Sequence, residues 1–221
     1  ATWDRTGRGW GFNYGLTAIS PEFQAAAGFV NRNGVVQTHA FNRLTWYGRR
    51  GALFETATTF ITIQRIWDYA SFGSRGAVEG SEGIQPSVTM RGGWNVTTSI
   101  SRQFFRFDPA FYAPDSVIVT GGTGPDTIPF AVPGKLDNLL NASGRITTCV
   151  FRRFSGNVSA GYAAGVIFQE AVESRETRTA AQLDWRPMRQ ARVSVQYTRL
   201  VIDRARELRR AEIGCSILKT G

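Results

Sequence analysis

The stretch Gly9-Trp10-Gly11-Phe12-Asn13-Tyr14-Gly15-Leu16-Thr17-Ala18 alternates between two kinds of side chain. Successive side chains of an extended strand point to opposite faces, so one face collects Trp10, Phe12, Tyr14 and Leu16. The other face collects glycine, asparagine and threonine. Large apolar groups that alternate with small or polar groups over about ten residues are typical of a transmembrane β-strand, with lipid on one side and a polar lumen on the other.

The same alternation recurs along the chain and predicts about eleven antiparallel strands. Turn residues such as Asn33-Gly34 and Gly92-Gly93 separate them and supply the backbone conformations of tight hairpins. We expect strands over residues 9–18, 23–30, 35–47, 52–67, 84–91, 94–107, 139–153, 157–170, 176–185, 192–202 and 209–218. The predicted fold class is all-β: one antiparallel up-and-down transmembrane β-barrel segment over residues 1–221, forming a barrel or a large part of one.

Two long connections, 68–83 and 108–138, are predicted on the same, external side of the sheet. With strict up-and-down order, the turns at Gly92-Gly93, Ser155-Gly156 and Pro187-Met188 lie at the opposite end. Short periplasmic turns and longer external loops are the known asymmetry of outer-membrane barrels. Eleven strands with an open edge are not tolerated in lipid. Either the count is wrong, or further strands outside this sequence or other chains cover the edges.

The composition narrows the function classes. No run of about eighteen apolar residues occurs, so a transmembrane helix is excluded. The net charge of +9 comes mostly from arginines scattered singly over strands and turns. Because arginine pairs well with phosphate, this charge favours anionic lipid head groups over nucleic acid. The expected partners are the lipid bilayer and lipopolysaccharide, with other outer-membrane or surface proteins as further candidates and no nucleic acid.

The residues give no sign of an enzyme, a cofactor or a metal site. His39 is the only histidine, and neither a Gly-x-Ser-x-Gly motif nor zinc-ligand spacing occurs. The carboxylates Glu55, Glu170 and Asp184 belong to distant strands, and nothing marks two of them as an acid–base pair. We therefore expect no catalytic residues and no cofactor.

The strand phases predict three groups of candidate site residues. Charged residues expected to line the lumen are Arg43, Glu55, Arg65, Arg91, Arg145, Arg153 and Asp184. A basic ring in a pore favours anions, whereas a plugged lumen would let these charges pair with each other. Residues expected to face lipid are Trp10, Phe12, Tyr14, Leu16, Trp94, Val96, Tyr162, Val166 and Phe168.

The third group lies where a predicted strand runs into the long external loop, and comprises Phe107, Asp108, Phe111 and Tyr112. Aromatic residues at the end of a membrane strand usually form the interfacial girdle. The alternative is a binding surface for a protein partner or a glycan, because aromatic faces suit both.

Two short motifs near the N-terminus, Ser20-Pro21-Glu22-Phe23 and Gly28-Phe29-Val30-Asn31-Arg32, resemble a signature of a bacterial outer-membrane family of unknown function. The resemblance extends weakly through Trp67-Asp68-Tyr69, Phe107-Asp108-Pro109 and Trp185-Arg186-Pro187. Members of that family typically carry an N-terminal domain similar to a family-nine carbohydrate-binding module, followed by a large C-terminal barrel. The resemblance implies a Gram-negative outer-membrane location, with the sugar-binding-like domain and some strands lying outside this sequence. The family has no agreed catalytic residues.

Three functions remain open on the sequence. The first is an outer-membrane β-barrel involved in solute passage or docking at the cell surface. The second is a structural barrel scaffold within a larger outer-membrane or surface assembly. The third is a soluble antiparallel β-barrel or sandwich that binds a small ligand or glycan, in which the outward aromatic residues would be buried in protein.

Overall fold

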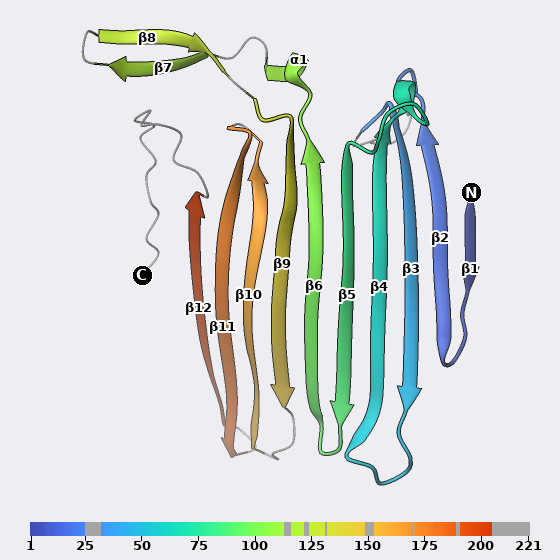
Figure 1. The fold of residues 1–221 in the computed structure, drawn as a ribbon. Helices are drawn as coiled ribbons and strands as arrows, with labels where there is room; N and C mark the ends of the chain where they lie inside the picture. The colour runs from blue at the N-terminus through green and yellow to red at the C-terminus, as the bar shows by residue number, and fades with distance from the viewer. Residues whose placement is uncertain are drawn as a thin grey trace.

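The chain forms one large antiparallel β-sheet with almost no helix (Figure 1). The computed structural model describes residues 1–24, 32–112, 116–121, 124–130, 132–148, 153–168, 170–188 and 191–204. Ten strands follow one another in the sheet in chain order: β1 (Thr2–Arg5), β2 (Trp10–Ile19), β3 (Val35–Tyr47), β4 (Phe54–Asp68), β5 (Glu79–Met90), β6 (Trp94–Arg106), β9 (Lys135–Thr148), β10 (Phe154–Ile167), β11 (Val172–Met188) and β12 (Ala191–Arg204).

The sheet is open, and its two edges are β1 and β12. The connection between β6 and β9 carries the short helix α1 (Pro109–Tyr112) and a separate hairpin of β7 (Ser116–Gly121) and β8 (Gly124–Pro129). A single 3-10 turn, η1 (Tyr69–Ser71), follows β4. Over the described ranges, no helix has both the length and the apolar character needed to span a membrane.

The register of the ladders assigns the strand side chains to two faces, because residues directly opposite each other in an antiparallel pair share a face. Starting from Trp10 and following these pairs across the sheet gives the face that we call the apolar face. It includes Trp10, Leu16, Leu44, Trp46, Ile61, Ile63, Ile84, Trp94, Val96, Ile100, Leu140, Ala142, Ile146, Val158, Ala160, Tyr162, Leu183, Trp185, Val195 and Tyr197.

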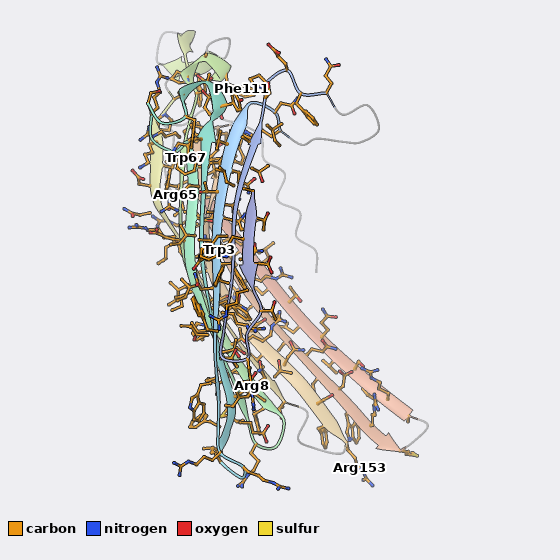
Figure 2. All side chains as sticks on the ribbon, turned by 90° about the vertical axis from the view of Figure 1, so that its right-hand side faces the viewer. Trp3, Arg8, Arg65, Trp67, Phe111 and Arg153 are labelled. Atoms are coloured by element: carbon orange, nitrogen blue, oxygen red, sulfur yellow. The ribbon has the colours of Figure 1, made fainter. Side chains whose placement is uncertain are left out.

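The opposite side, the polar face, is dominated by hydroxyl, amide and charged groups. It includes Asn13, His39, Arg43, Thr62, Gln64, Ser81, Ser87, Asn95, Thr97, Ser99, Ser101, Asn141, Ser143, Arg145, Asn157, Ser159, Glu176, Arg178, Gln182 and Asp184. Figure 2 views the sheet from the β1 edge and shows side chains on both sides of a strongly twisted sheet. The antiparallel alternation predicted from the sequence is therefore confirmed across the sheet.

In the described part of the chain, a cluster of buried residues lies at the end of the sheet that carries the long connections. Phe107, Tyr112 and Ala171 are buried together there, with Phe105 and Phe130 packed against them. This cluster joins the β6–β9 connection to the β10–β11 connection. Elsewhere in the described chain, the main-chain ladders hold the strands together, and the apolar face is left uncovered.

Several predicted elements differ from the structure. β2 pairs directly with β3. Of the predicted strand 23–30, Phe23 and Gln24 belong to the connection, and residues 25–30 lie outside the described residues. Ser155-Gly156 is part of β10 rather than a turn, because both residues pair with β11. β11 runs from Val172 to Met188 and is therefore longer at both ends than the predicted strand 176–185. The predicted strand 209–218 lies outside the described residues.

Three strands that the alternation missed are short. β1 has only four residues, which is too few to show a period. β7 and β8 lie inside the predicted loop 108–138, of which residues from Lys135 onward already belong to β9. The predicted loop 68–83 is likewise shorter, because β5 begins at Glu79. Figure 1 confirms that both long connections lie at one end of the sheet and the short turns at the other.

Candidate functional site

The polar face carries separate hydrogen-bonded groups of hydroxyl, amide and imidazole side chains. On β5 and β6, Ser87 and Thr97 share a hydrogen bond of 3.0 Å between their hydroxyl oxygens. Asn95 Nδ2 donates to Thr89 Oγ1 at 3.2 Å and to Ser87 Oγ at 3.4 Å. On β2 and β3, a ring nitrogen of His39 lies 2.6 Å from Asn13 Oδ1. These short polar side chains present donors and acceptors without filling the space above the sheet.

Two arginines flank β10 on the polar face. Arg145 on β9 lies opposite Ser159, and Arg178 on β11 lies opposite Gly161. None of the ion pairs within the described ranges involves either arginine. Because β10 contributes only small side chains here, both guanidinium groups border an open strip of the face. Arg145 and Arg178 place two positive charges beside this strip, and Glu176 lies on the same face of β11.

A shallow hollow of ≈ 230 Å³ lies beside Arg178. Gly161 of β10 has no side chain and keeps the hollow open. The polar groups that line it come from three strands: Ser99, Asn141, Ser143, Glu176 and Arg178. A Cβ on Gly161 would come within 3.2 Å of the Ser143 side chain. The hollow combines hydroxyl and amide groups with one carboxylate and one guanidinium, which suits a small polar solute.

The other predicted lumen charges on this face have internal partners. Arg43 Nη2 donates to the carbonyl of Gly7 at 2.6 Å. Asp184 Oδ1 accepts hydrogen bonds from Arg192 Nη2 at 2.8 Å and from the Ser194 hydroxyl. Gln182 Nε2 donates to the second oxygen of the same carboxylate at 3.3 Å. Arg43 and Asp184 therefore build the face, whereas Arg145 and Arg178 remain available to a solute.

Arg65 is on the wrong face in the sequence-based assignment. It lies opposite Thr38, which in turn lies opposite Leu16, so Arg65 belongs to the apolar face. Phe60, on the same strand, lies opposite Arg43 on the polar face and stacks on Phe41 with 5.5 Å between ring centroids. Apolar residues occur on both faces of β4, which makes its phase ambiguous without the partner strand.

Three further predicted lumen residues lie at strand ends. Glu55 falls where the β4–β5 register shifts between Phe54 and Thr56, so strict alternation does not assign its face. Arg91 belongs to the β5–β6 turn, where its guanidinium donates to the Gly51 carbonyl at 3.2 Å. Arg153 precedes β10, and its carbonyl accepts from the Arg186 amide. These three side chains are placed by turns and an irregularity rather than by the strand phase.

Eight of the nine residues predicted to face lipid have the strand phase of the apolar face: Trp10, Phe12, Tyr14, Leu16, Trp94, Val96, Tyr162 and Val166. Phe12 is nevertheless buried, because Trp3 on the edge strand β1 covers it with 4.7 Å between ring centroids. The one amide nearby, Asn42, accepts hydrogen bonds from the Tyr14 hydroxyl at 2.8 Å and from Trp10 Nε1 at 3.3 Å. A polar atom on this face is thus satisfied within the sheet.

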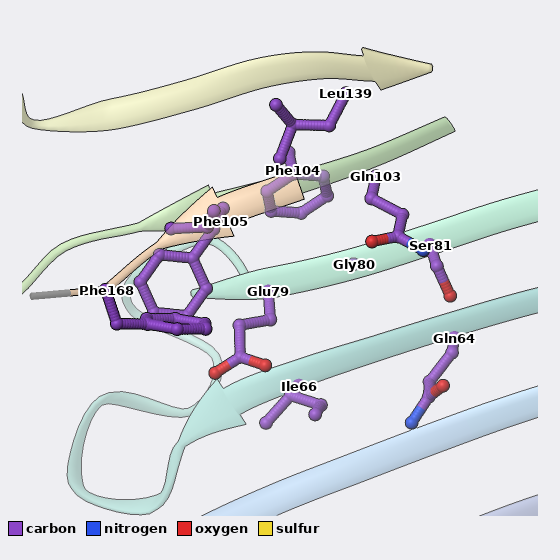
Figure 3. Close-up of a pocket in the computed structure, with 11 residues that line it drawn as sticks. Gln64, Ile66, Glu79, Gly80, Ser81, Gln103, Phe104, Phe105, Leu139 and Phe168 are labelled. Atoms are coloured by element: carbon purple, nitrogen blue, oxygen red, sulfur yellow. The ribbon is translucent and has the colours of Figure 1, made fainter. Parts of the chain in front are cut away.

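Two of the nine lie at the loop end. Val166 keeps the apolar phase in the β10–β11 ladder, whereas Phe168 lies beyond the end of β10. Val166 packs against the buried cluster of Phe107 and Tyr112. The ring of Phe168 contacts Phe105 edge-to-face at 5.0 Å, as Figure 3 shows. Both residues line a hollow of ≈ 320 Å³ at the loop end, with Gln64, Glu79, Ser81, Gln103 and Leu139. The loop end of β10 therefore packs against the β6–β9 connection instead of continuing the lipid-facing pattern.

Burial also divides the predicted binding group in the long loop. Phe107 and Tyr112 are each only 5% exposed, and the Tyr112 hydroxyl donates to the Phe168 carbonyl at 2.6 Å. Asp108 starts the short helix α1, with its Oδ1 accepting from the Ala110 amide at 3.0 Å. Phe111 is 77% exposed. Three of the four residues therefore build the loop, and Phe111 alone presents its ring outward.

Several residues that the alternation left out join these faces. Arg178 shares the phase of Asp184 along β11, so the pattern could have found it. Glu82, Arg102 and Lys135 gather around Phe104 at the loop end of the apolar face, and only the ladders bring these four strand positions together. The described ranges hold no group of three or more acidic, histidine or cysteine side chains placed to bind a metal ion.

Comparisons of this chain with protein-family models, curated proteins and solved structures found no match.

Proposed function

We propose that this chain forms part of an outer-membrane β-barrel through which small polar solutes pass. The apolar face contacts lipid and the polar face lines the lumen. One observation carries the proposal: a single sheet of ten strands has one face of exposed apolar side chains and one face of short polar side chains. The outer membrane is the location that such a sheet favours, because β-structure crosses a bilayer only as a closed barrel.

The exposure of the apolar face supports contact with lipid. Trp46 and Val158 are each 56% exposed and Ile100 is 52% exposed, on strands far apart in the sheet. Contiguous apolar patches on soluble monomers seldom exceed a few hundred Å². A face of this kind that continues across ten strands requires apolar surroundings, and a bilayer supplies them.

The spacing of aromatic residues matches the thickness of a membrane. Trp46 lies opposite Ala57, near the short turns, and Trp67 lies ten residues further along β4 on the same face. Ten strand residues span about 33 Å along the strand. With the tilt of roughly 40° that membrane strands adopt, the height is about 25 Å, which is the height of the lipid-facing band of such barrels.

The polar face supports passage rather than a packed interior. Its central side chains are short, and Arg145 and Arg178 border an open strip without ionic partners in the described chain. A basic lumen favours anionic solutes. The structural scaffold remains the second candidate, favoured by Asp184, whose carboxylate is fully engaged by Arg192, Ser194 and Gln182.

Closure is a requirement of the proposal. Unpaired main-chain groups at β1 and β12 cannot stand in hydrocarbon, so in the membrane both edges pair with each other or with further strands. The complete protein is therefore the correct material for a test.

The first test is the electrophoretic mobility of the full-length protein from isolated outer membranes, with and without boiling. A mobility shift on heating, with recovery in the detergent fraction, is expected for a closed membrane barrel. Release by salt or alkali without a heat shift would overturn the proposal in favour of a soluble β-domain. Conductance in planar bilayers then separates passage from scaffold: an open lumen conducts, and a filled one does not.

A further inference from the structure

At the loop end of the apolar face, charged side chains on neighbouring strands surround the ring of Phe104. We call this group the rim cluster: Arg65, Glu82, Arg102, Phe104, Arg106 and Lys135. Glu82 holds two arginines at once. Arg65 Nη2 donates to Glu82 Oε2 at 2.8 Å, and Arg102 Nε donates to Glu82 Oε1 at 2.9 Å. Glu82 lies opposite Arg102 and Ile63 in the ladders, so the group belongs to the apolar face.

Phe104 sits between two cations of the rim cluster. The guanidinium carbon of Arg65 lies 5.5 Å from the centre of its ring, and the Lys135 ammonium lies 4.6 Å from it. Arg102 also donates from Nη1 to Asn138 Oδ1 at 3.3 Å and keeps a side chain that is 59% exposed. The sheet thus fixes the cations in place while leaving their outer edges accessible.

The charge balance of the rim cluster is positive. Its four cations face Glu82 and the nearby Asp137, which lies 2.6 Å from Lys135. Lys135 and Arg106 are also directly opposite each other in the β6–β9 ladder. Like charges in this position repel. Asp137 forms an ion pair with Lys135 but with neither of the neighbouring arginines. An anion bound between the strands would reduce the remaining repulsion.

The residues beneath the rim cluster identify the kind of anion. Directly toward the sheet centre on the same face lie Ile84 and Ile100, and Arg102 itself lies opposite Leu140. The rest of a ligand whose anionic group is bound here would lie over these apolar side chains. This arrangement fits an amphiphile whose phosphate meets the cations and whose acyl chains lie on the isoleucines and leucine.

We infer that the rim cluster binds the phosphate groups of a lipid head group in the outer leaflet, such as that of lipopolysaccharide. Arg102, Arg106 and Lys135 supply charge-assisted hydrogen bonds, which arginine makes well to phosphate. Glu82 positions Arg65 and Arg102. The inference rests on the proposed membrane location of the apolar face, because only that location brings a lipid head group to this height.

The test uses full-length protein in nanodiscs of phosphatidylcholine, titrated with bisphosphorylated lipid A or with the same lipid after its phosphates are removed. The variant R102A/K135A removes two cations. The matched control R145A/R178A removes two arginines from the polar face. We expect the rim variant to weaken binding of the phosphorylated lipid at least about tenfold and the control to leave binding unchanged.

Three results would overturn the inference: equal binding of the two lipids, equal loss in both variants, or full displacement of the lipid by millimolar inorganic phosphate. The last result would assign the site to free phosphate. If R102A/K135A does not fold, the single change R102Q, at a side chain that is 59% exposed, provides the same comparison. The heat-shift assay runs beside each titration. Loss of the shift in the parent protein refutes the membrane barrel itself, whereas a retained shift without phosphate preference refutes only the lipid site.

Discussion

Arg65 lies directly opposite Thr38 in the β3–β4 ladder, and this pairing places it on the face of the sheet that also carries Leu16. Arg43, only a few residue pairs away, lies opposite Phe60 on the other face. Two arginines on adjacent strands therefore belong to different environments. One is part of a charged rim on an apolar surface, and the other is part of the polar face.

The two faces of β10 give the sharpest prediction. Ala160 lies on the apolar face between Gly144 and Thr179, and Ser159 lies on the polar face between Arg145 and Ala180. In the membrane, Ala160→Arg is expected to cost about 2–4 kcal/mol of folding free energy near the bilayer midplane. Ser159→Arg is expected to be mild, because its side chain enters a wet lumen. Urea unfolding in lipid vesicles measures both, and equal costs would refute the face assignment.

Gly15 and His39 are expected to be coupled. They lie opposite each other, and a Cβ on Gly15 would come within 2.2 Å of His39 Cε1. Gly15→Ala must displace the imidazole and break its contact with Asn13, so we expect a loss of roughly 1–3 kcal/mol from overpacking. In the double variant with His39→Ala the added penalty should disappear. A double-mutant cycle by chemical unfolding tests this, and strictly additive effects would contradict the contact.

Arg145 and Arg178 are expected to set the charge preference of the lumen. Replacing both with glutamine removes the cations that lack an ionic partner in the described chain and leaves the Asp184–Arg192 pair intact. Reversal potentials across a salt gradient should move toward cation preference. Arg65→Gln on the opposite face serves as the control and should leave the potential unchanged. A shift in the control alone would place the pore on the other side of the sheet.

The Tyr112 hydroxyl is expected to tie the long loop to the end of β10. It donates to the Phe168 carbonyl at 2.6 Å inside the buried cluster. Tyr112→Phe should destabilise this end locally by about 0.5–1.5 kcal/mol, the usual net value of one hydrogen bond. Faster proteolysis or amide exchange in residues 107–112 would report it. Phe111→Ala, at an exposed ring, is the comparison that should change neither rate.

The sequence alone predicted the strands and the polarity of most of their faces. Period-two alternation assigned Trp10, Leu16, Trp94 and Val96 to the same side, and the ladders put them on one face. Alternation succeeds here because strand geometry sends neighbouring side chains to opposite faces whatever the partner strand is. The up-and-down order and the placement of long connections at one end also follow from local turn residues and strand lengths.

Tertiary structure decided what one strand cannot show about itself. The sequence showed which residues of β4 share a face, but only the register with β3 shows which of the two faces is the apolar one. A shift of the register by one residue would move every side chain of the strand to the opposite face. The irregularities at Glu55 and near Asn138, whose φ is 59°, break the period where the alternation was extrapolated. Burial of Phe107 and Tyr112, and the meeting of Arg65, Glu82 and Lys135 around Phe104, arise from contacts between segments far apart in sequence. Such contacts leave no local pattern, so only the folded sheet reveals them.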